Sequence, residues 1–161
     1  MIIGLALKNY KTYKNLHYIP ISYGSSFSSF LGPNGVGKTS IFEALDKFFY
    51  GGEWVINNES KRNQDEAFLS PLFLIPIDKI HLAKKDKKIA ALISNYFWNT
   101  DITEYNPFIK KFKESIESLK KISLGVETHY LIFIGVMNKT NEINIPHFHK
   151  DIEKLLDAED D

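Results

Sequence analysis

The sequence predicts an α/β fold, and three observations support that class. Continuous apolar runs at 1–7 and 129–137 are typical of buried strands. In 38–50 and 107–122 the apolar residues recur at spacings of three and four, which is the pattern of an amphipathic helix. A glycine-rich segment at 32–39 stands between the first strand-like stretches and the first helix, so strand, loop and helix follow one another in that order.

Size and composition narrow the class of protein. A chain of 161 residues is long enough for one domain, and a hydrophobic content of 43 % is enough to form a core. Lys+Arg and Asp+Glu both number 20, so no overall basic field attracts nucleic acid, although a local patch is not excluded. The absence of cysteine excludes disulfides, thiolate nucleophiles and Cys-ligated metal sites.

The sequence also bears on location. No apolar run approaches the roughly 18 residues that a membrane-spanning helix needs. The N-terminus lacks the basic flank that precedes the apolar part of a signal peptide. We therefore expect a cytoplasmic protein with no membrane partner.

The first half of the chain is expected to open with a strand at 1–7 and a β-rich aromatic stretch at 10–21. A short strand at 27–31 then leads into the glycine-rich segment. The helix at 38–50 ends at a pair of glycines, which commonly follow a helix end. The polar residues 53–70 are expected to form a surface loop.

The second half is less regular. Residues 71–77 are apolar but contain two prolines, which makes them a poor central strand. Residues 84–122 are basic with helical spacing and predict a helical insertion, whose second helix runs over 107–122. The run 129–137 predicts one continuous buried strand, and 148–156 a short last helix.

One segment matches a chemical motif in full, the pattern G-x-x-x-x-G-K-[ST]. The matching residues are Gly32-Pro33-Asn34-Gly35-Val36-Gly37-Lys38-Thr39. Glycines allow successive backbone N–H groups to curl into a nest around an anion, without side chains that would fill its space. The loop opens a helix, so the positive end of the helix dipole faces the same anion.

Lys38 and Thr39 complete the predicted phosphate site. Lys38 is placed to reach the β- and γ-phosphates, and the Thr39 hydroxyl is placed to ligate Mg²⁺. Mg²⁺ prefers oxygen ligands and retains several waters, so one hydroxyl together with phosphate oxygens is a normal set. The motif therefore predicts a P-loop NTPase that binds ATP and Mg²⁺.

Two blocks of the sequence resemble one group of ATPases. Residues 5–16, LALKNYKTYKNL, are similar to the opening strand of the ABC-type ATPases related to SMC, RecF and OLD proteins. Residues 30–45, FLGPNGVGKTSIFEAL, are similar to their phosphate loop and the helix after it. The two blocks have the expected separation, and the resemblance covers residues 1 to about 50.

The resemblance implies an ABC-ATPase-like head with a mixed sheet and flanking helices, in which ATP lies between two paired heads. It implies that Tyr10 or Tyr13 lies near the base, although packing against the sheet is the favoured interpretation of these two residues. Together, the motif and the resemblance assign to the nucleotide Gly32, Pro33, Asn34, Gly35, Val36, Gly37, Lys38, Thr39 and Ser40 in the loop, and Lys11 and Thr12 in the opening block.

The sequence departs from that group after the first helix. A Walker B strand has four apolar residues followed by Asp-Glu, but in 74–78 Pro76 interrupts the apolar run and Lys79 stands in the place of Glu. Residues 123–125 match the signature loop poorly, and Asn138 stands where a glutamine is expected. We therefore expect residues 1–161 to form one incomplete head, with the catalytic residues unassigned and with unaided hydrolysis slow.

Two functions remain open. In the first, the head pairs with a second copy and switches a DNA- or RNA-processing assembly, as in Septu-type or retron-linked anti-phage systems with an HNH or other nuclease partner. In the second, the chain is a non-hydrolysing nucleotide sensor that holds a partner complex together. A small-molecule kinase is disfavoured, because the opening block resembles ATPase heads.

Two clusters outside the motif carry weaker alternatives. His147 and His149 can approach one metal ion, but surface histidines are the favoured interpretation. The lysines of 84–88 precede the aromatic residues of 96–98, which is compatible with nucleic-acid binding, although a solvated helix start is favoured.

Overall fold

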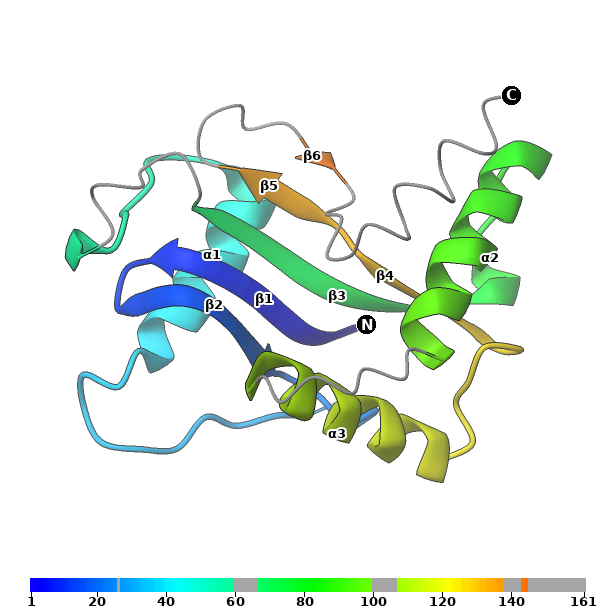
Figure 1. The fold of residues 1–161 in the computed structure, drawn as a ribbon, viewed down its shortest axis with the longest axis horizontal. Coiled ribbons are helices and arrows are strands. Elements are labelled where there is room, and N and C mark those ends of the chain that lie inside the picture. The colour runs from blue at the N-terminus through cyan, green and yellow to red at the C-terminus, as the bar shows by residue number, and fades with distance from the viewer. Residues whose placement is uncertain (26, 60–66, 100–106, 138–142, 145–161) are drawn as a thin grey trace.

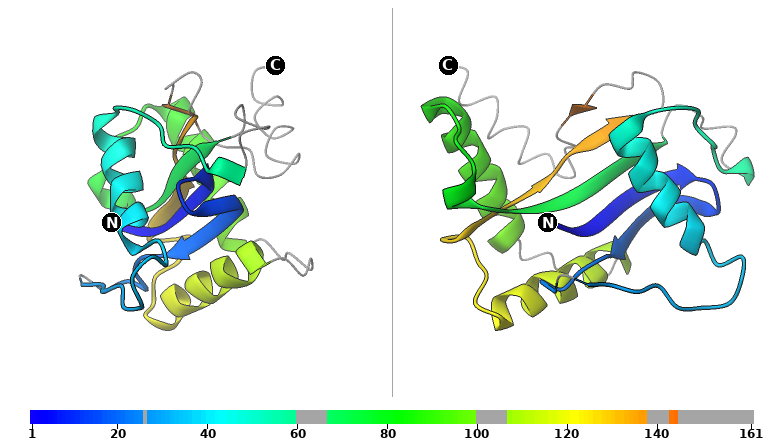
Figure 2. Two further views of the ribbon diagram at one scale, coloured as in Figure 1. Left: turned by 90° about the vertical axis from the view of Figure 1, so that its left-hand side faces the viewer. Right: turned by 180° about the vertical axis from the view of Figure 1, so that it is seen from behind.

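A computed structural model describes residues 1–25, 27–59, 67–99, 107–137 and 143–144, which form an α/β arrangement in three layers (Figure 1). In chain order the elements are β1 (Ile2–Tyr10), β2 (Tyr13–Pro20), α1 (Lys38–Tyr50), β3 (Phe68–Pro76), the short 3₁₀ helix η2 (Ile77–Lys79), α2 (Lys84–Asn99), α3 (Pro107–Lys121), β4 (His129–Phe133), β5 (Gly135–Met137) and β6 (Ile143–Asn144). Helix α1 lies on one side of the sheet and α3 on the other (Figure 2). None of these helices combines the length and the apolar character needed to cross a bilayer.

The sheet has the strand order β2-β1-β3-β5-β6, and β4 also pairs with β3. Every pairing between the described strands is antiparallel. The predicted α/β class is therefore confirmed, but the expected mixed sheet is not what these strands form. Antiparallel neighbours need only short connections, and the turn between β1 and β2 spans two residues.

The two faces of the sheet carry separate cores. On the first face, Leu5, Leu7 and Leu69 pack with Ile41 and Ala44 of α1. On the second face, the sheet packs against α2 and α3; the buried residues there are Ile3, Ala6, Tyr18, Leu72, Leu74, Ile93, Phe97, Trp98, Phe112, Ile116, Leu119, Leu131 and Phe133. A sheet covered on both faces explains why β1 is apolar almost throughout.

Three of the four predicted helical segments fall on described residues, and all three are helices. Helix α1 covers the predicted 38–50, begins after Gly37 and ends at Gly51, whose φ is 73°. Helix α3 ends one residue before the predicted 122. Helices α2 and α3 both lie inside the predicted insertion 84–122. The predicted helix at 148–156 lies outside the described residues.

The expectation that 71–77 makes a poor central strand is wrong, because β3 lies between β1 and the strands β4 and β5. The Pro71 carbonyl accepts a hydrogen bond from the Ile134 N–H at 3.2 Å. The N–H and C=O of a strand residue point to the same side, so the N–H that proline lacks also faces Ile134. Ile134 is the residue at which β4 and β5 separate.

The same feature corrects two further boundaries. The predicted continuous strand 129–137 is divided at Ile134 into β4 and β5, opposite the proline of the neighbouring strand. The predicted loop 53–70 is too long by three residues, because β3 already begins at Phe68.

The strand predicted at 27–31 is absent. These residues have no regular structure, and the side chains of Phe27 and Leu31 are 80 % and 91 % exposed. A strand is stabilised by the strands that pair with it. In the described part of the chain the sheet ends at β2, and no strand pairs with 27–31.

A glycine in β1 gives a test of the second core. A side chain on Gly4 would overlap the phenol of Tyr18. Tyr18 cannot easily move, because its ring packs edge-on against Phe108, Phe112 and Phe133 at centroid distances of 5.5, 5.6 and 6.4 Å. We expect Gly4→Ala to lower the free energy of unfolding by about 1–3 kcal/mol, measured by urea denaturation.

The control for that variant is Gly125→Ala, where the added methyl group meets nothing within 4 Å. It should change the free energy of unfolding by less than about 0.5 kcal/mol. Equal stability of the two variants would show that Tyr18 is not fixed as described.

Candidate nucleotide site

The glycine-rich loop has the backbone conformation that the motif requires. Gly35 and Gly37 have φ values of 84° and 88°, in the left-handed region that other residues avoid. Residues 32–36 are exposed, and α1 begins immediately afterwards at Lys38. The unpaired N–H groups of the first helical turn are therefore at the open end of this loop.

The side chain of Lys38 folds back over the loop. Its ammonium group donates hydrogen bonds to the carbonyl oxygens of Gly32 and Pro33, both at 2.5 Å. The first residues of the loop are thereby drawn toward the start of α1. A cation held in this way lies against the loop backbone, and it can exchange these carbonyl oxygens for the oxygens of a bound anion.

The turn between β1 and β2 packs against the end of the loop. The Tyr13 hydroxyl donates a hydrogen bond to the Gly37 carbonyl at 3.3 Å. A Cβ atom on Gly37 would lie 2.7 Å from Thr12 Oγ1 and 3.0 Å from the Tyr13 hydroxyl. Gly37 is thus required twice, for its positive φ and for the close approach of this turn.

Lys11 in the same turn forms an ion pair with Glu43 of α1. Its backbone is fixed from the other side: its N–H donates to the Val55 carbonyl at 2.9 Å, and its carbonyl accepts from the Asn57 side chain at 2.6 Å. The turn is therefore tied both to α1 and to the segment after it. The sequence assigned Lys11 and Thr12 to the nucleotide site, but the role of Glu43 was missed. The sign of that role in the sequence is an acidic residue one helical turn after Thr39.

Tyr10 and Tyr13, the two tyrosines that the resemblance places near the base, differ in side-chain exposure. Tyr10 is 2 % exposed and packs edge-on against Trp54 at 6.0 Å, so it belongs to the core. Tyr13 is half-buried at the loop. Burial raises the pKa of both phenols, and Glu43 and Asp46 raise that of Tyr10 further, so both tyrosines are neutral hydrogen-bond donors at physiological pH.

The two hydroxyl residues after Lys38 differ in exposure. Thr39 is exposed in the first turn of α1, whereas Ser40 is 6 % exposed. Thr39 can therefore offer its hydroxyl to a metal ion beside the loop. Ser40 can contribute its backbone N–H more readily than its side chain.

A buried lysine lies at the other end of α1. The amino group of Lys47 lies over the Trp54 ring, 5.6 Å from its centroid. Burial lowers the pKa of Lys47, and the nearby Glu53 partly opposes the shift. This lysine packs against the segment after the helix and is remote from the loop.

Other residues considered from the sequence lie far from the loop. The strand register places Lys8 opposite Phe68 and Ile2 opposite Phe73, so the C-terminal end of β3 lies at the opposite end of β1 from the turn. Asp78 follows that end and is exposed beside Lys79. It is therefore no Walker B acid for this loop. Asn138, His147 and His149 lie outside the described residues.

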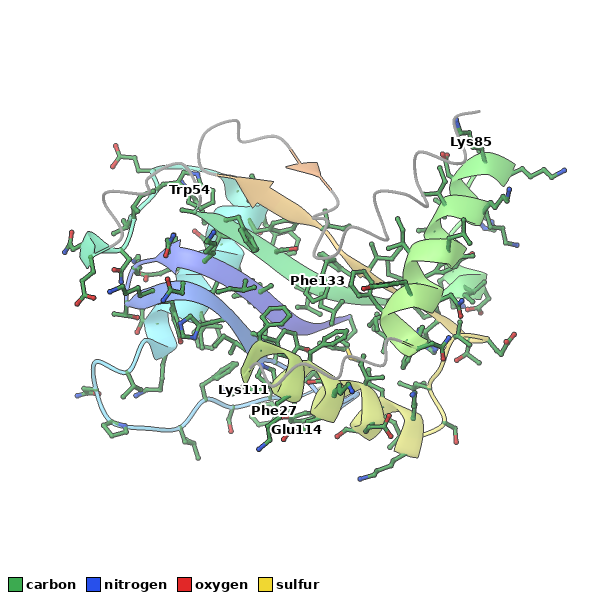
Figure 3. All side chains as sticks on the ribbon, viewed as in Figure 1. Phe27, Trp54, Lys85, Lys111, Glu114 and Phe133 are labelled. Carbon is green, nitrogen blue, oxygen red and sulfur yellow. The ribbon has the colours of Figure 1, made fainter. Side chains whose placement is uncertain are left out.

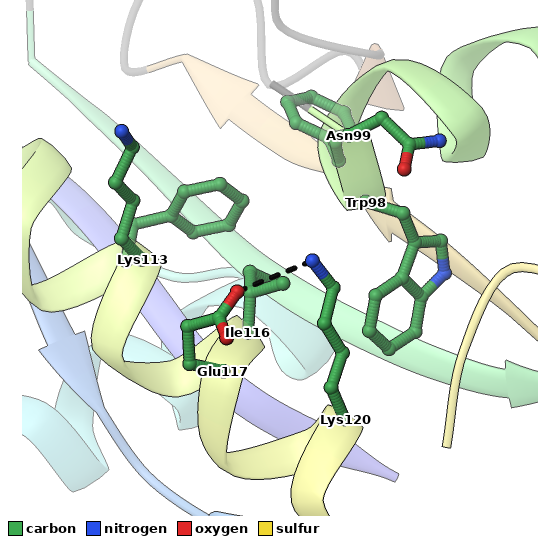
Figure 4. A pocket seen from close by; sticks show the side chains of 8 residues that line it. Trp98, Asn99, Lys113, Ile116, Glu117 and Lys120 are labelled. Atoms are coloured by element: carbon green, nitrogen blue, oxygen red, sulfur yellow. Dashed lines mark hydrogen bonds and ion pairs between the residues drawn. The ribbon is translucent and has the colours of Figure 1, made fainter. Parts of the chain in front are cut away.

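Metal-binding clusters and cavities were also considered in the described residues. No group of three His, Asp or Glu side chains there can hold a metal ion. A cavity of about 250 Å³ lies between α2 and α3 (Figure 4), lined by Phe97, Trp98, Asn99, Phe112, Lys113, Ile116, Glu117 and Lys120. It lies on the second face of the sheet, whereas α1 and its loop belong to the first.

Comparison with protein families gives a match to the AAA ATPase domain over residues 1–160. The chain belongs to the AAA ATPase domain family. Comparison with curated proteins gives no match. Membership of the AAA ATPase domain family indicates nucleotide binding and ATPase activity, and members of the family generally use ATP with Mg²⁺.

The close packing at Gly37 gives a test of this region. We expect Gly37→Ala to weaken nucleotide binding by about tenfold, because an added methyl group displaces Thr12 and Tyr13 and strains a residue of positive φ by about 1–2 kcal/mol. Titration with a fluorescent ATP analogue in the presence of Mg²⁺ measures the affinity.

Gly51→Ala is the matched control. Gly51 also has a positive φ, but a methyl group there meets nothing within 4 Å and lies at the far end of α1. It should lower stability and leave nucleotide affinity unchanged. Equal losses of affinity in the two variants would mean that general destabilisation, not the loop, controls binding.

Proposed function

We propose that residues 32–39 bind the phosphates of Mg²⁺–ATP. The observation that carries this proposal is the position of Lys38, whose ammonium group lies across a loop of positive-φ glycines at the start of a helix. Backbone N–H groups, the helix dipole and one ammonium group there act on the same volume. Membership of the AAA ATPase domain family supports the assignment.

Each side chain at the loop has a separate role in this proposal. Lys38 exchanges the Gly32 and Pro33 carbonyls for β- and γ-phosphate oxygens, and the exposed Thr39 hydroxyl ligates Mg²⁺. Thr12 and Lys11 border the site from the β1–β2 turn. Glu43 neutralises Lys11, so Lys11 attracts phosphate weakly unless that ion pair opens.

Hydrolysis requires a group that orients the attacking water. In the part of the chain that the structure describes, Glu43 is paired with Lys11 and Asp78 lies at the opposite end of β3, so neither is placed for this role. We therefore propose that a second head completes the site, with ATP bound between two copies. The assembly switched in this way is a DNA- or RNA-processing complex with an HNH or other nuclease, of the anti-phage type.

The positions of Glu43 and Asp78 also favour one alternative, in which the chain is a scaffold that binds ATP without hydrolysing it. ATP occupancy would then hold a partner complex together, and loss of the nucleotide would release it. The two functions differ in whether a hydrolysis-deficient second head alters the outcome. Such a change matters only for the ATPase.

Lys38→Ala tests the site itself. Removing a charged hydrogen-bond donor to phosphate costs about 1.5–3 kcal/mol, so we expect affinity for Mg²⁺–ATP to fall by about 10- to 100-fold. Isothermal titration calorimetry measures it, with Lys14→Ala as the control because Lys14 is exposed and pairs with Glu59 at 2.9 Å. Unchanged binding in Lys38→Ala would contradict the proposal.

Turnover tests the need for a second head. We expect the chain at low concentration to hydrolyse ATP more slowly than about 1 s⁻¹, an ordinary enzyme rate. Turnover should rise with protein concentration as Mg²⁺–ATP drives dimerisation, followed by light scattering. Fast hydrolysis by a monomer would overturn the paired-head model, whereas ATP-dependent dimers without turnover would favour the scaffold.

A further inference from the structure

The first turns of α2 carry an unusual concentration of positive charge. Lys84, Lys85, Lys87 and Lys88 fall within five residues, all are exposed, and Asp86 is the acid among them. Figure 3 shows Lys85 at the outer end of the helix, away from the sheet. In a chain with no net charge, this cluster is a strong local excess.

The helix gains nothing from lysines at this position. The N-terminus of a helix carries a partial positive charge, so cations in the first turn are disfavoured by about 0.3–1 kcal/mol each and acids are preferred. A local rule broken at an exposed site often marks a functional surface. The cluster therefore requires an explanation other than helix stability.

The other exposed residues of α2 indicate the chemistry of a binding partner. Ala91, Asn95 and Asn99 are exposed and continue the side that begins at the lysines, with Asn99 donating to Asn95 at 2.6 Å. Among the apolar residues of α2, Ile93 and Phe97 are buried in the second core. The outward side thus offers ammonium and amide groups, with the half-buried side chain of Leu92 between them.

This composition fits a phosphate backbone better than a membrane or a protein. An interfacial helix inserts an apolar side into the bilayer, and that side of α2 is already buried. Protein interfaces depend on aromatic or large aliphatic anchors, and none is exposed on α2. Lysine point charges and polar side chains are the groups that contact nucleic-acid phosphates.

We propose that Lys84, Lys85, Lys87 and Lys88, the α2 basic cluster, bind the phosphate backbone of nucleic acid without sequence preference. Lys85 and Lys88 also take part in interactions within the chain, so phosphates replace those contacts on binding. The cluster follows η2 at the end of β3 remote from the nucleotide loop. The two sites are separate, and each can be tested without the other.

The experiment compares two variants of equal charge change in the whole chain. One replaces Lys84, Lys85, Lys87 and Lys88 with glutamine. The control replaces Lys110, Lys111, Lys120 and Lys121 of α3, where Glu114 and Glu117 are interleaved and Lys120 pairs with Glu117 at 3.2 Å (Figure 4). Glutamine is a good helix former, so both variants should retain the fold, which circular dichroism checks.

Fluorescence anisotropy with labelled duplex DNA and with single-stranded RNA, at salt concentrations from about 50 to 200 mM, measures binding. We expect the α2 variant to weaken binding at least tenfold at the lowest salt. Four phosphate contacts give a slope of log K against log salt of about −3.6 on duplex DNA, and this dependence should largely vanish in the variant. The α3 control should lose less than about threefold.

Several outcomes overturn the proposal. Equal losses in the α2 and α3 variants would show that net charge alone drives binding. Absence of binding to DNA and to RNA by the unaltered chain at the lowest salt would show that the cluster has another role. Binding to phosphatidylserine vesicles that the α2 variant loses, without binding to nucleic acid, would assign the cluster to a membrane surface.

Discussion

The close contact between the β1–β2 turn and Gly37 is the constraint on which the candidate site depends. A residue without a side chain allows Thr12 and Tyr13 to approach the last carbonyl of the loop, and Tyr13 donates a hydrogen bond to it. Because β1 contributes buried residues to both cores, the turn that follows it is held in place by the sheet. The loop is thereby positioned by a strand that is buried on both faces.

The sheet also separates the two ends of the molecule chemically. At one end are the loop, the β1–β2 turn and the ion pair between Lys11 and Glu43. At the other end, η2 leads from β3 into α2 and its lysines. Strand β3 lies between the proposed nucleotide site and the proposed polyanion site, so the ligands of the two sites do not come into contact. Charge repulsion between ATP and nucleic acid is then small, because it falls off within about 10 Å in salt.

The elements that the sequence predicted well are those whose signal is local. Helix α1 shows helical spacing of apolar residues and a glycine at its end, and both of its bounds were predicted correctly. Strand β1 is an apolar run that needs no knowledge of its neighbours. The glycines of the loop are also a local signal: they mark positions of positive φ and can be recognised in the sequence without knowledge of the rest of the fold.

The elements that were predicted wrongly depend on partners distant in the chain. Pro71 is tolerated in a central strand because its missing N–H faces the break at Ile134, and neither residue reveals this by itself. Residues 27–31 have the composition of a strand, but pairing decides whether a strand forms, and the described sheet ends at β2. The ion pair of Lys11 with Glu43 joins two segments whose proximity only the fold establishes.

The central claim is that a nucleotide's phosphates lie against the backbone of the loop. The most direct measurement is the change in backbone amide signals, observed by NMR, when Mg²⁺–ATP is added to the isotopically labelled chain. The account predicts that the largest shifts occur at Gly35, Gly37, Lys38 and Thr39 and that Lys38→Ala needs about 10- to 100-fold more Mg²⁺–ATP to produce them. Shifts centred on the residues of the cavity between α2 and α3, with the loop unchanged, would contradict it.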